Sequence, residues 1–191
     1  MCMQKQKLVN LGFKDLQNRD YSSALKKFQK AIQTCPEDEN AHLGLGFLFQ
    51  QNRKYDLALK EINKTLKINP LQGKGFMGQA LVFLERGELA LAEKKLNKAM
   101  EMSPLDGDIH QSFSILYRER GDFNTALKYI RKALKLDPQN AVSYQEQGFI
   151  YLEQKKMGPA LKAFNRAMKL MPFSSEAIHG RGQVYRRQKR Y

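Results

Sequence analysis

Residues 118–140 read RERGDFNTALKYIRKALKLDPQN, and the features of this stretch recur along the chain every 34 residues. Five of the six prolines mark the period: Pro36, Pro70, Pro104, Pro138 and Pro172. Cutting the chain on this period gives repeats at 5–38, 39–72, 73–106, 107–140 and 141–174, then a half repeat at 175–191. An internal repeat of this length predicts one structural unit per repeat, stacked on its neighbours.

The repeats agree column by column when they are aligned on this period. One column is alanine throughout: Ala24, Ala58, Ala92, Ala126 and Ala160. A second is always small: Gly12, Gly46, Ala80, Ser114, Gly148 and Gly182. A third is bulky and apolar: Phe28, Ile62, Leu96, Ile130 and Phe164. Small residues leave room for bulky ones where two helices cross closely, so these columns predict packed helices.

The spacing of apolar residues predicts two helices in each repeat. In repeat 39–72 one helical face is formed by His42, Leu45, Gly46 and Phe49, and a second by Ala58, Ile62, Thr65 and Leu66. Residues suited to cap the N-termini of the first helices are Asp38, Asp106, Asn140 and Ser174. Those suited to cap the second helices are Ser22, Asp56 and Asn124. The recurrent proline ends the second helix.

This pattern resembles the tetratricopeptide repeat family, and residues 118–140 match it best. The resemblance covers residues 5–191, with Asp15 departing from an otherwise aromatic column. It implies an all-α, right-handed solenoid of antiparallel helix pairs, built as a single array over residues 1–191. The first helices of the pairs would line its concave face. A lone helix pair cannot bury its apolar face, whereas stacked pairs can.

Composition indicates a globular, basic protein. The 191 residues carry 33 Lys and Arg against 19 Asp and Glu, a net charge of +14. No apolar run is long enough to span a membrane, and the N-terminus has no apolar run typical of a secretory signal. The two cysteines, Cys2 and Cys35, form no disulfide framework. A cytoplasmic location is therefore expected.

The sequence offers no constellation of catalytic or metal-binding residues. The three histidines, His42, His110 and His179, lie in different repeats and are expected to pack on helix faces. Asp106-Gly107-Asp108 lacks the ligand pattern of a calcium loop, and Gly73-Lys74-Gly75 lacks the spacing of a phosphate loop. We therefore expect no enzyme activity, cofactor or metal.

Apolar positions of the first helices are the leading candidate for a peptide-binding groove. They are Val9, Phe13, Leu16, Leu43, Gly44, Phe47, Met77, Gly78, Leu81, Leu84, Ile115 and Phe149. Gly44 and Gly78 are expected to add open space, while polar residues such as Gln145 and Glu146 should line the C-terminal part of the groove. An exposed apolar patch typically marks a partner site. The alternative is that these side chains only close the seams between helices.

Basic residues recur twice in every second helix. They are Lys26, Lys30, Lys60, Lys64, Lys94, Lys98, Lys128, Lys132, Lys162 and Arg166, here called the Lys ladder. The ladder is either a solvated outer face or a binding surface for an acidic protein or an anionic membrane. Nucleic acid is disfavoured, because Tyr129 is the only evident aromatic residue on this stripe that could stack with bases.

These observations favour a non-catalytic scaffold that binds a protein or peptide in its concave groove. The chaperone-tail adaptors of the family hold a C-terminal carboxylate with Lys and Asn residues, of which only Lys74 is present here. One alternative is the targeting arm of a larger enzyme or of a secretion or assembly machine, since Tyr191 stands where a further helix would pack. Others are an adaptor to anionic surfaces through the Lys ladder, and self-association through the terminal repeats.

Overall fold

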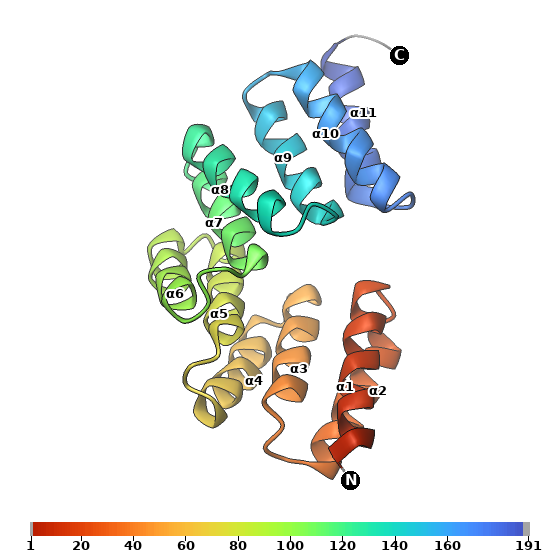
Figure 1. Cartoon of the computed structure of the whole chain (residues 1–191), viewed down its shortest axis with the longest axis vertical. Coiled ribbons are helices and arrows are strands. Elements are labelled where there is room, and N and C mark those ends of the chain that lie inside the picture. The colour runs from red at the N-terminus through yellow and green to blue at the C-terminus, as the bar shows by residue number, and fades with distance from the viewer. Residues whose placement is uncertain (1, 189–191) are drawn as a thin grey trace. The chain divides into compact units, whose positions relative to one another are not determined.

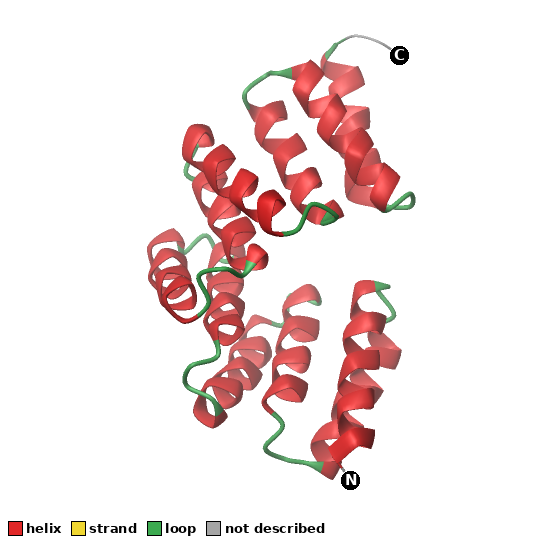
Figure 2. Cartoon of the chain, viewed as in Figure 1, coloured by secondary structure: helices red, strands yellow, loops and turns green. Residues whose placement is uncertain are grey.

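The computed structural model describes residues 2–188, which form eleven α-helices and no strand (Figure 2). The helices are α1 (Cys2–Gln17), α2 (Tyr21–Thr34), α3 (Glu39–Gln51), α4 (Tyr55–Ile68), α5 (Gly73–Glu85), α6 (Leu89–Met102), α7 (Gly107–Glu119), α8 (Phe123–Leu136), α9 (Ala141–Glu153), α10 (Met157–Leu170) and α11 (Ser175–Arg187). Each repeat contributes one antiparallel helix pair, so the predicted all-α repeat architecture is confirmed. None of the described helices is long and apolar enough to cross a membrane.

The helices form two compact units, Met1–Pro104 with α1–α6 and Leu105–Tyr191 with α7–α11. Within unit 1 the first helices α1, α3 and α5 lie side by side, and α2 and α4 each pack on their own first helix and on the next (Figure 1). Unit 2 repeats this arrangement with α7, α9 and α11 as first helices. A single array over residues 1–191 stays a prediction, and Tyr191 lies outside the described residues.

The predicted caps of the first helices are confirmed, and those of the second helices are wrong. The side chains of Asp38 and Ser174 accept hydrogen bonds from backbone N–H groups at 2.8 and 3.1 Å. The second helices begin earlier than predicted, after Asp20 and Asp122, whose carboxylates accept from Ser23 N and Thr125 N at 3.0 Å. The residues named as caps, Ser22, Asp56 and Asn124, lie in the first turn instead.

A left-handed residue reverses the chain between the two helices of every pair. The residues with positive φ are Arg19, Arg53, Gly87, Gly121 and Lys155, one in each repeat. Glycine adopts this conformation freely, whereas it costs other residues about 1 kcal/mol. The turn is therefore retained even where the sequence places a less suitable residue in it.

Glycines on two neighbouring first helices form a socket for one bulky side chain of the second helix between them. Phe28 is fully buried, and a Cβ atom on Gly12 or Gly44 would lie only 2.7 or 2.3 Å from its ring. Such close approach requires glycine at both positions. The arrangement recurs with Ile62 between Gly46 and Gly78, and with Phe164 between Gly148 and Gly180. Each of these three core side chains is thus packed between two glycines from different repeats.

Candidate interaction surfaces

Part of the predicted groove remains accessible in unit 1. We call the surface around Phe13, Phe47 and Leu81, one residue from each of α1, α3 and α5, the first-helix face. These three side chains are partly exposed, as is Leu16. Other candidates are core residues with no surface to offer a partner: Val9, Leu43, Met77 and Leu84. The accessible apolar surface is therefore narrower than the sequence predicts.

The partly exposed rings also pack against the core. Phe13 meets Phe28 edge to face, with ring centroids 5.2 Å apart. In unit 2 Phe149 meets Phe164 in the same way at 5.1 Å, and Ile115 is partly exposed like Phe149. Each aromatic residue of this column thus closes a seam with one edge and leaves some surface accessible.

The expectation that Gly44 and Gly78 provide open space is wrong. The position beside Gly44 is filled by the Phe28 ring, which comes from the second helix of the preceding repeat. A Cβ atom on Gly78 would lie 3.1 Å from Ile62 and 3.2 Å from Phe47. Both glycines therefore serve close helix packing and leave no room for a partner.

The polar residues expected to line the C-terminal part of the groove instead join neighbouring helices of unit 2. Arg118 Nε donates to Glu146 Oε1 at 2.7 Å, and Gln145 Nε2 donates to Ser174 Oγ at 2.7 Å. Gln145, Glu146 and Ser174 are buried. Burial raises the pKa of Glu146, while the Arg118 guanidinium opposes the rise. These groups are already satisfied within the unit.

All ten residues of the Lys ladder are exposed, on α2, α4, α6, α8 and α10. Helices α8 and α10 carry four and three basic residues and no acidic residue. Lys64 donates to Glu61 Oε1 at 2.8 Å, so part of the ladder charge on α4 is compensated. Helix α2 likewise carries three basic residues and no acidic residue, although its Lys27 pairs with Asp15 of α1. The uncompensated positive charge is therefore shared by α2, α8 and α10.

Three ladder residues lie over aromatic rings, which the sequence did not lead us to expect. Lys98 lies 5.6 Å from the ring centroid of Phe76, Lys132 5.6 Å from Tyr129, and Arg166 5.7 Å from Tyr144. Phe76 and Tyr144 occupy the same column of the first helices, two repeats apart. Comparing this column with the ladder positions of the second helices would have revealed them. The expectation that Tyr129 is the only aromatic residue along the ladder is therefore wrong, although each of the three rings already has a cation over it.

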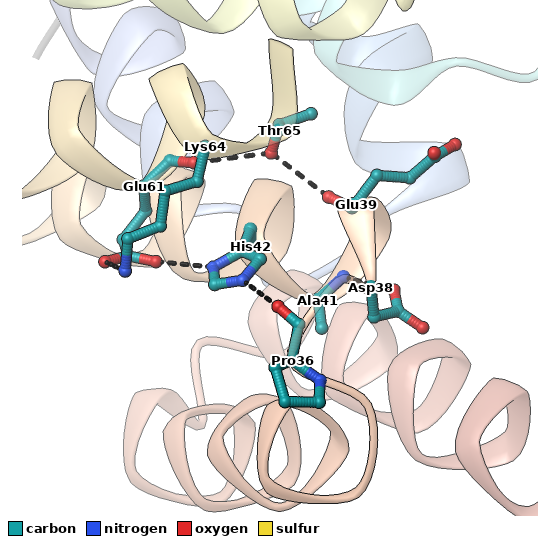
Figure 3. Close-up of polar contacts among 8 residues, drawn as sticks. All are labelled: Pro36, Asp38, Glu39, Ala41, His42, Glu61, Lys64 and Thr65. Carbon is teal, nitrogen blue, oxygen red and sulfur yellow. Dashed lines mark hydrogen bonds and ion pairs between the residues drawn. The ribbon is translucent and has the colours of Figure 1, made fainter. Parts of the chain in front are cut away.

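His42 is a buried structural link in unit 1 (Figure 3). Its Nδ1 lies 2.7 Å from Glu61 Oε2 and its Nε2 lies 2.9 Å from the carbonyl oxygen of Pro36. The two ring nitrogens thus link α3 to α4 and to the segment that precedes α3. Burial alone would raise the pKa of Glu61, but hydrogen bonds from Lys64 and His42 outweigh it and lower that pKa. The described residues contain no cluster of His, Cys, Asp or Glu that could hold a metal ion.

Profiles described as "Tetratricopeptide repeat" match residues 15–70, 48–106 and 109–140 of this chain. These matches cover more than half of the sequence. A search of curated proteins found no match.

Several solved structures are similar to this one. A chain of the APC/C hetero-tetramer Cut9-Hcn1 has a TM-score of 0.82 and 18% identity, with 97% of this chain and 37% of that chain covered. TTC0263, a thermophilic TPR protein of Thermus thermophilus, has a TM-score of 0.82 and 20% identity, with 94% and 98% covered. YrrB, described as a TPR protein with an unusual peptide-binding site, has a TM-score of 0.57 and 20% identity, with 92% and 90% covered. This chain spans little more than a third of the first of these, and such identities show a shared fold only.

Proposed function

The chain belongs to the tetratricopeptide repeat family, and we propose that it is a non-catalytic scaffold that binds a segment of a partner protein on the first-helix face. Repeats of this family typically serve protein–protein interaction. YrrB, which has a similar fold, is described as having a peptide-binding site. Partly exposed apolar side chains at a regular spacing suit either an extended peptide or one face of a helix.

The single observation that carries this proposal is the position of Phe47. It lies on α3, the middle first helix of unit 1, and is partly exposed although the residues beside it are buried. Its ring reaches α5 near Gly78, so the ring is held in place by packing. A fixed, partly exposed aromatic side chain is typical of the anchors that contribute most to binding.

Replacing Phe47 with alanine should weaken the binding of the natural partner at least about tenfold, because loss of an anchor contact typically costs ~2 kcal/mol or more. The partner is first identified by comparing proteins captured by wild type and variant with mass spectrometry. It is then purified and titrated by calorimetry. The control is Glu153→Ala in unit 2, which removes an exposed side chain and should change the affinity little.

Circular dichroism and thermal unfolding decide whether Phe47→Ala tests binding at all. A residue that only seals the helices would lose about 3–5 kcal/mol of folding free energy on truncation. A variant that unfolds, or one that folds and binds normally, contradicts the proposal.

A second candidate function is an adaptor to anionic surfaces, favoured by the exposure of the whole Lys ladder. Changing Lys60, Lys94 and Lys128 to Glu should abolish binding to vesicles rich in phosphatidylserine and leave the far-ultraviolet circular dichroism spectrum unchanged. Wild-type binding should fall steeply with salt, because charges are screened within ~8 Å at physiological ionic strength. Salt-independent binding, or none, would leave the ladder a role in solubility alone.

A further inference from the structure

One position of the second helix contacts the first helix of its own repeat at Lys27, Glu61 and Tyr129. We call the residues at this position the seam column: Lys27, Glu61, Lys95, Tyr129 and Ala163, spaced 34 residues apart. Lys27 forms an ion pair with Asp15, which explains the departure of Asp15 from its otherwise aromatic column. Glu61 bonds to His42. The seam column therefore contacts the first helix through an ion pair in one repeat and through a hydrogen bond in the next.

Tyr129 fills the seam of its pair with an aromatic ring. The ring lies nearly parallel to Phe113, with centroids 4.8 Å apart and planes at 13°, and to Tyr117, at 5.5 Å and 9°. His110 lies 6.1 Å away on the same helix, α7. A flat ring is thus well accommodated at this seam position.

Ala163 occupies the same position one repeat later and has no ring to place there. The equivalents of Phe113 and Tyr117 are Gln147 and Tyr151 on α9, and they line an open pocket with a volume of about 500 Å³. Tyr144, the equivalent of His110, forms another part of the wall. This volume lies within the usual ~300–1,000 Å³ of ligand pockets. Equivalent residues of the preceding repeat also line a hollow, of about 510 Å³, with Tyr129 in its wall. The two hollows differ in composition: Ala163 replaces Tyr129 and Gln147 replaces Phe113, while Tyr151 keeps the aromatic side chain of Tyr117.

A glycine on α10 keeps the pocket open. Gly158 lines it, and a Cβ atom on Gly158 would meet no other atom within 4 Å. Asn124 stands at the equivalent place in the preceding repeat, where Tyr129 fills the seam. Close packing does not require glycine here, unlike at Gly148 and Gly180.

Positive charge surrounds the pocket. Lys162 and Arg166 line it, and the same two residues border a second surface hollow together with Lys169. No acidic residue lies on α10 to compensate them. Arg166 also lies over the Tyr144 ring, so this wall does not offer a free face on which a base could stack.

We propose that this pocket binds an aromatic side chain of a partner protein, presented within an acidic segment. The aromatic side chain takes the place that Tyr129 occupies in the preceding repeat, against Tyr151. Acidic residues on either side of it meet Lys162 and Arg166. The site is separate from the first-helix face, so it holds or fails independently of binding there. It shares Lys162 and Arg166 with the Lys ladder but contains none of the three lysines changed to test the ladder, so the two tests remain distinguishable.

The test uses a fluorescently labelled synthetic peptide of Glu and Asp with one central Phe. Anisotropy titrations compare it with a peptide that has Ala in place of the Phe and with one that has Lys in place of the acidic residues. The wild-type protein should bind the first peptide, and either change should weaken binding at least about tenfold. Ala163→Tyr, which copies Tyr129 into the pocket, should weaken it to a similar extent. The variant should keep its helical circular dichroism signal.

A second variant covers the case in which Ala163→Tyr does not fold. In Gly158→Leu the new side chain projects into the open pocket and should abolish peptide binding. The matched control is Asn124→Leu at the equivalent place of the preceding repeat, which should leave binding unchanged. The inference is overturned if the acidic Phe peptide does not bind, or if both folded filling variants bind it as wild type does. A different ligand would also overturn the inference. This is the result if a single-stranded oligonucleotide or anionic vesicles bind and the filling variants weaken that binding, while the peptide does not bind.

Discussion

Replacing Phe28 with alanine should reduce the free energy of unfolding by about 3–5 kcal/mol. Phe28 is fully buried between Gly12 and Gly44 and also supports the Phe13 ring, so its loss leaves a cavity shared by α1, α2 and α3. The flanking residues Gly12 and Gly44 have no side chains that could fill that cavity. Urea unfolding monitored by circular dichroism measures the effect.

A double-mutant cycle with Gly44→Ala tests the socket directly. In the wild type the new methyl group would overlap the Phe28 ring, and overpacking of this kind typically costs ~1–3 kcal/mol. In the Phe28→Ala background the same methyl group enters the cavity, so Gly44→Ala should cost much less or stabilise the protein. Additive effects of the two substitutions would contradict the close contact.

Replacing Arg118 with methionine should destabilise the protein at neutral pH by about 3 kcal/mol, since the partner carboxylate is left buried without its counter-charge. Glu146 is buried, whereas Arg118 is about a quarter exposed, which favours the lower end of the usual range. Replacing both residues, as Arg118→Met with Glu146→Leu, removes the uncompensated charge and should recover most of the loss. Urea unfolding of the three proteins provides the comparison.

The pH dependence of Arg118→Met separates this explanation from a simple loss of packing. Burial already raises the pKa of Glu146, and removal of Arg118 removes the group that opposes the rise. The folded variant therefore holds a proton that the unfolded chain releases. Its stability falls as pH rises from the ordinary glutamate pKa through the raised value, and the deficit shrinks at lower pH. A deficit that is constant with pH would mean that lost packing, not charge, causes it.

The sequence predicted the helix pairs well because their signals lie within single repeats. The proline spacing and the alanine column recur in register, and Asp38 and Ser174 cap first helices as expected. The caps of the second helices were misplaced because two polar residues compete in the same short turn. Asp122 precedes Asn124 by two residues, and only the structure shows that its carboxylate reaches the N–H of Thr125.

The candidate sites were harder to predict because they depend on contacts between repeats. A glycine column shows that residues are small, but it does not show whether the space beside them is empty. At Gly44 that space is filled by Phe28, which the sequence alignment places in a different repeat and a different column. The pocket beside Ala163 was missed because its walls come from both helices of one repeat, which separate sequence columns do not bring together. Comparing side-chain volume along the seam column reveals only the change from Tyr129 to Ala163 in its wall.

The sockets have a consequence for the order in which helix pairs assemble. Phe28 fits only where the next first helix carries a glycine in the place of Gly44, and α9 carries Glu146 in that place. Helix α2 therefore cannot dock on α9 without burying a carboxylate against an aromatic ring. Chains built from near-identical modules risk stacking out of sequence or exchanging modules between copies. The joint between α2 and α3 accepts its own neighbour and disfavours at least one other, so differences between repeats can specify which pairs stack.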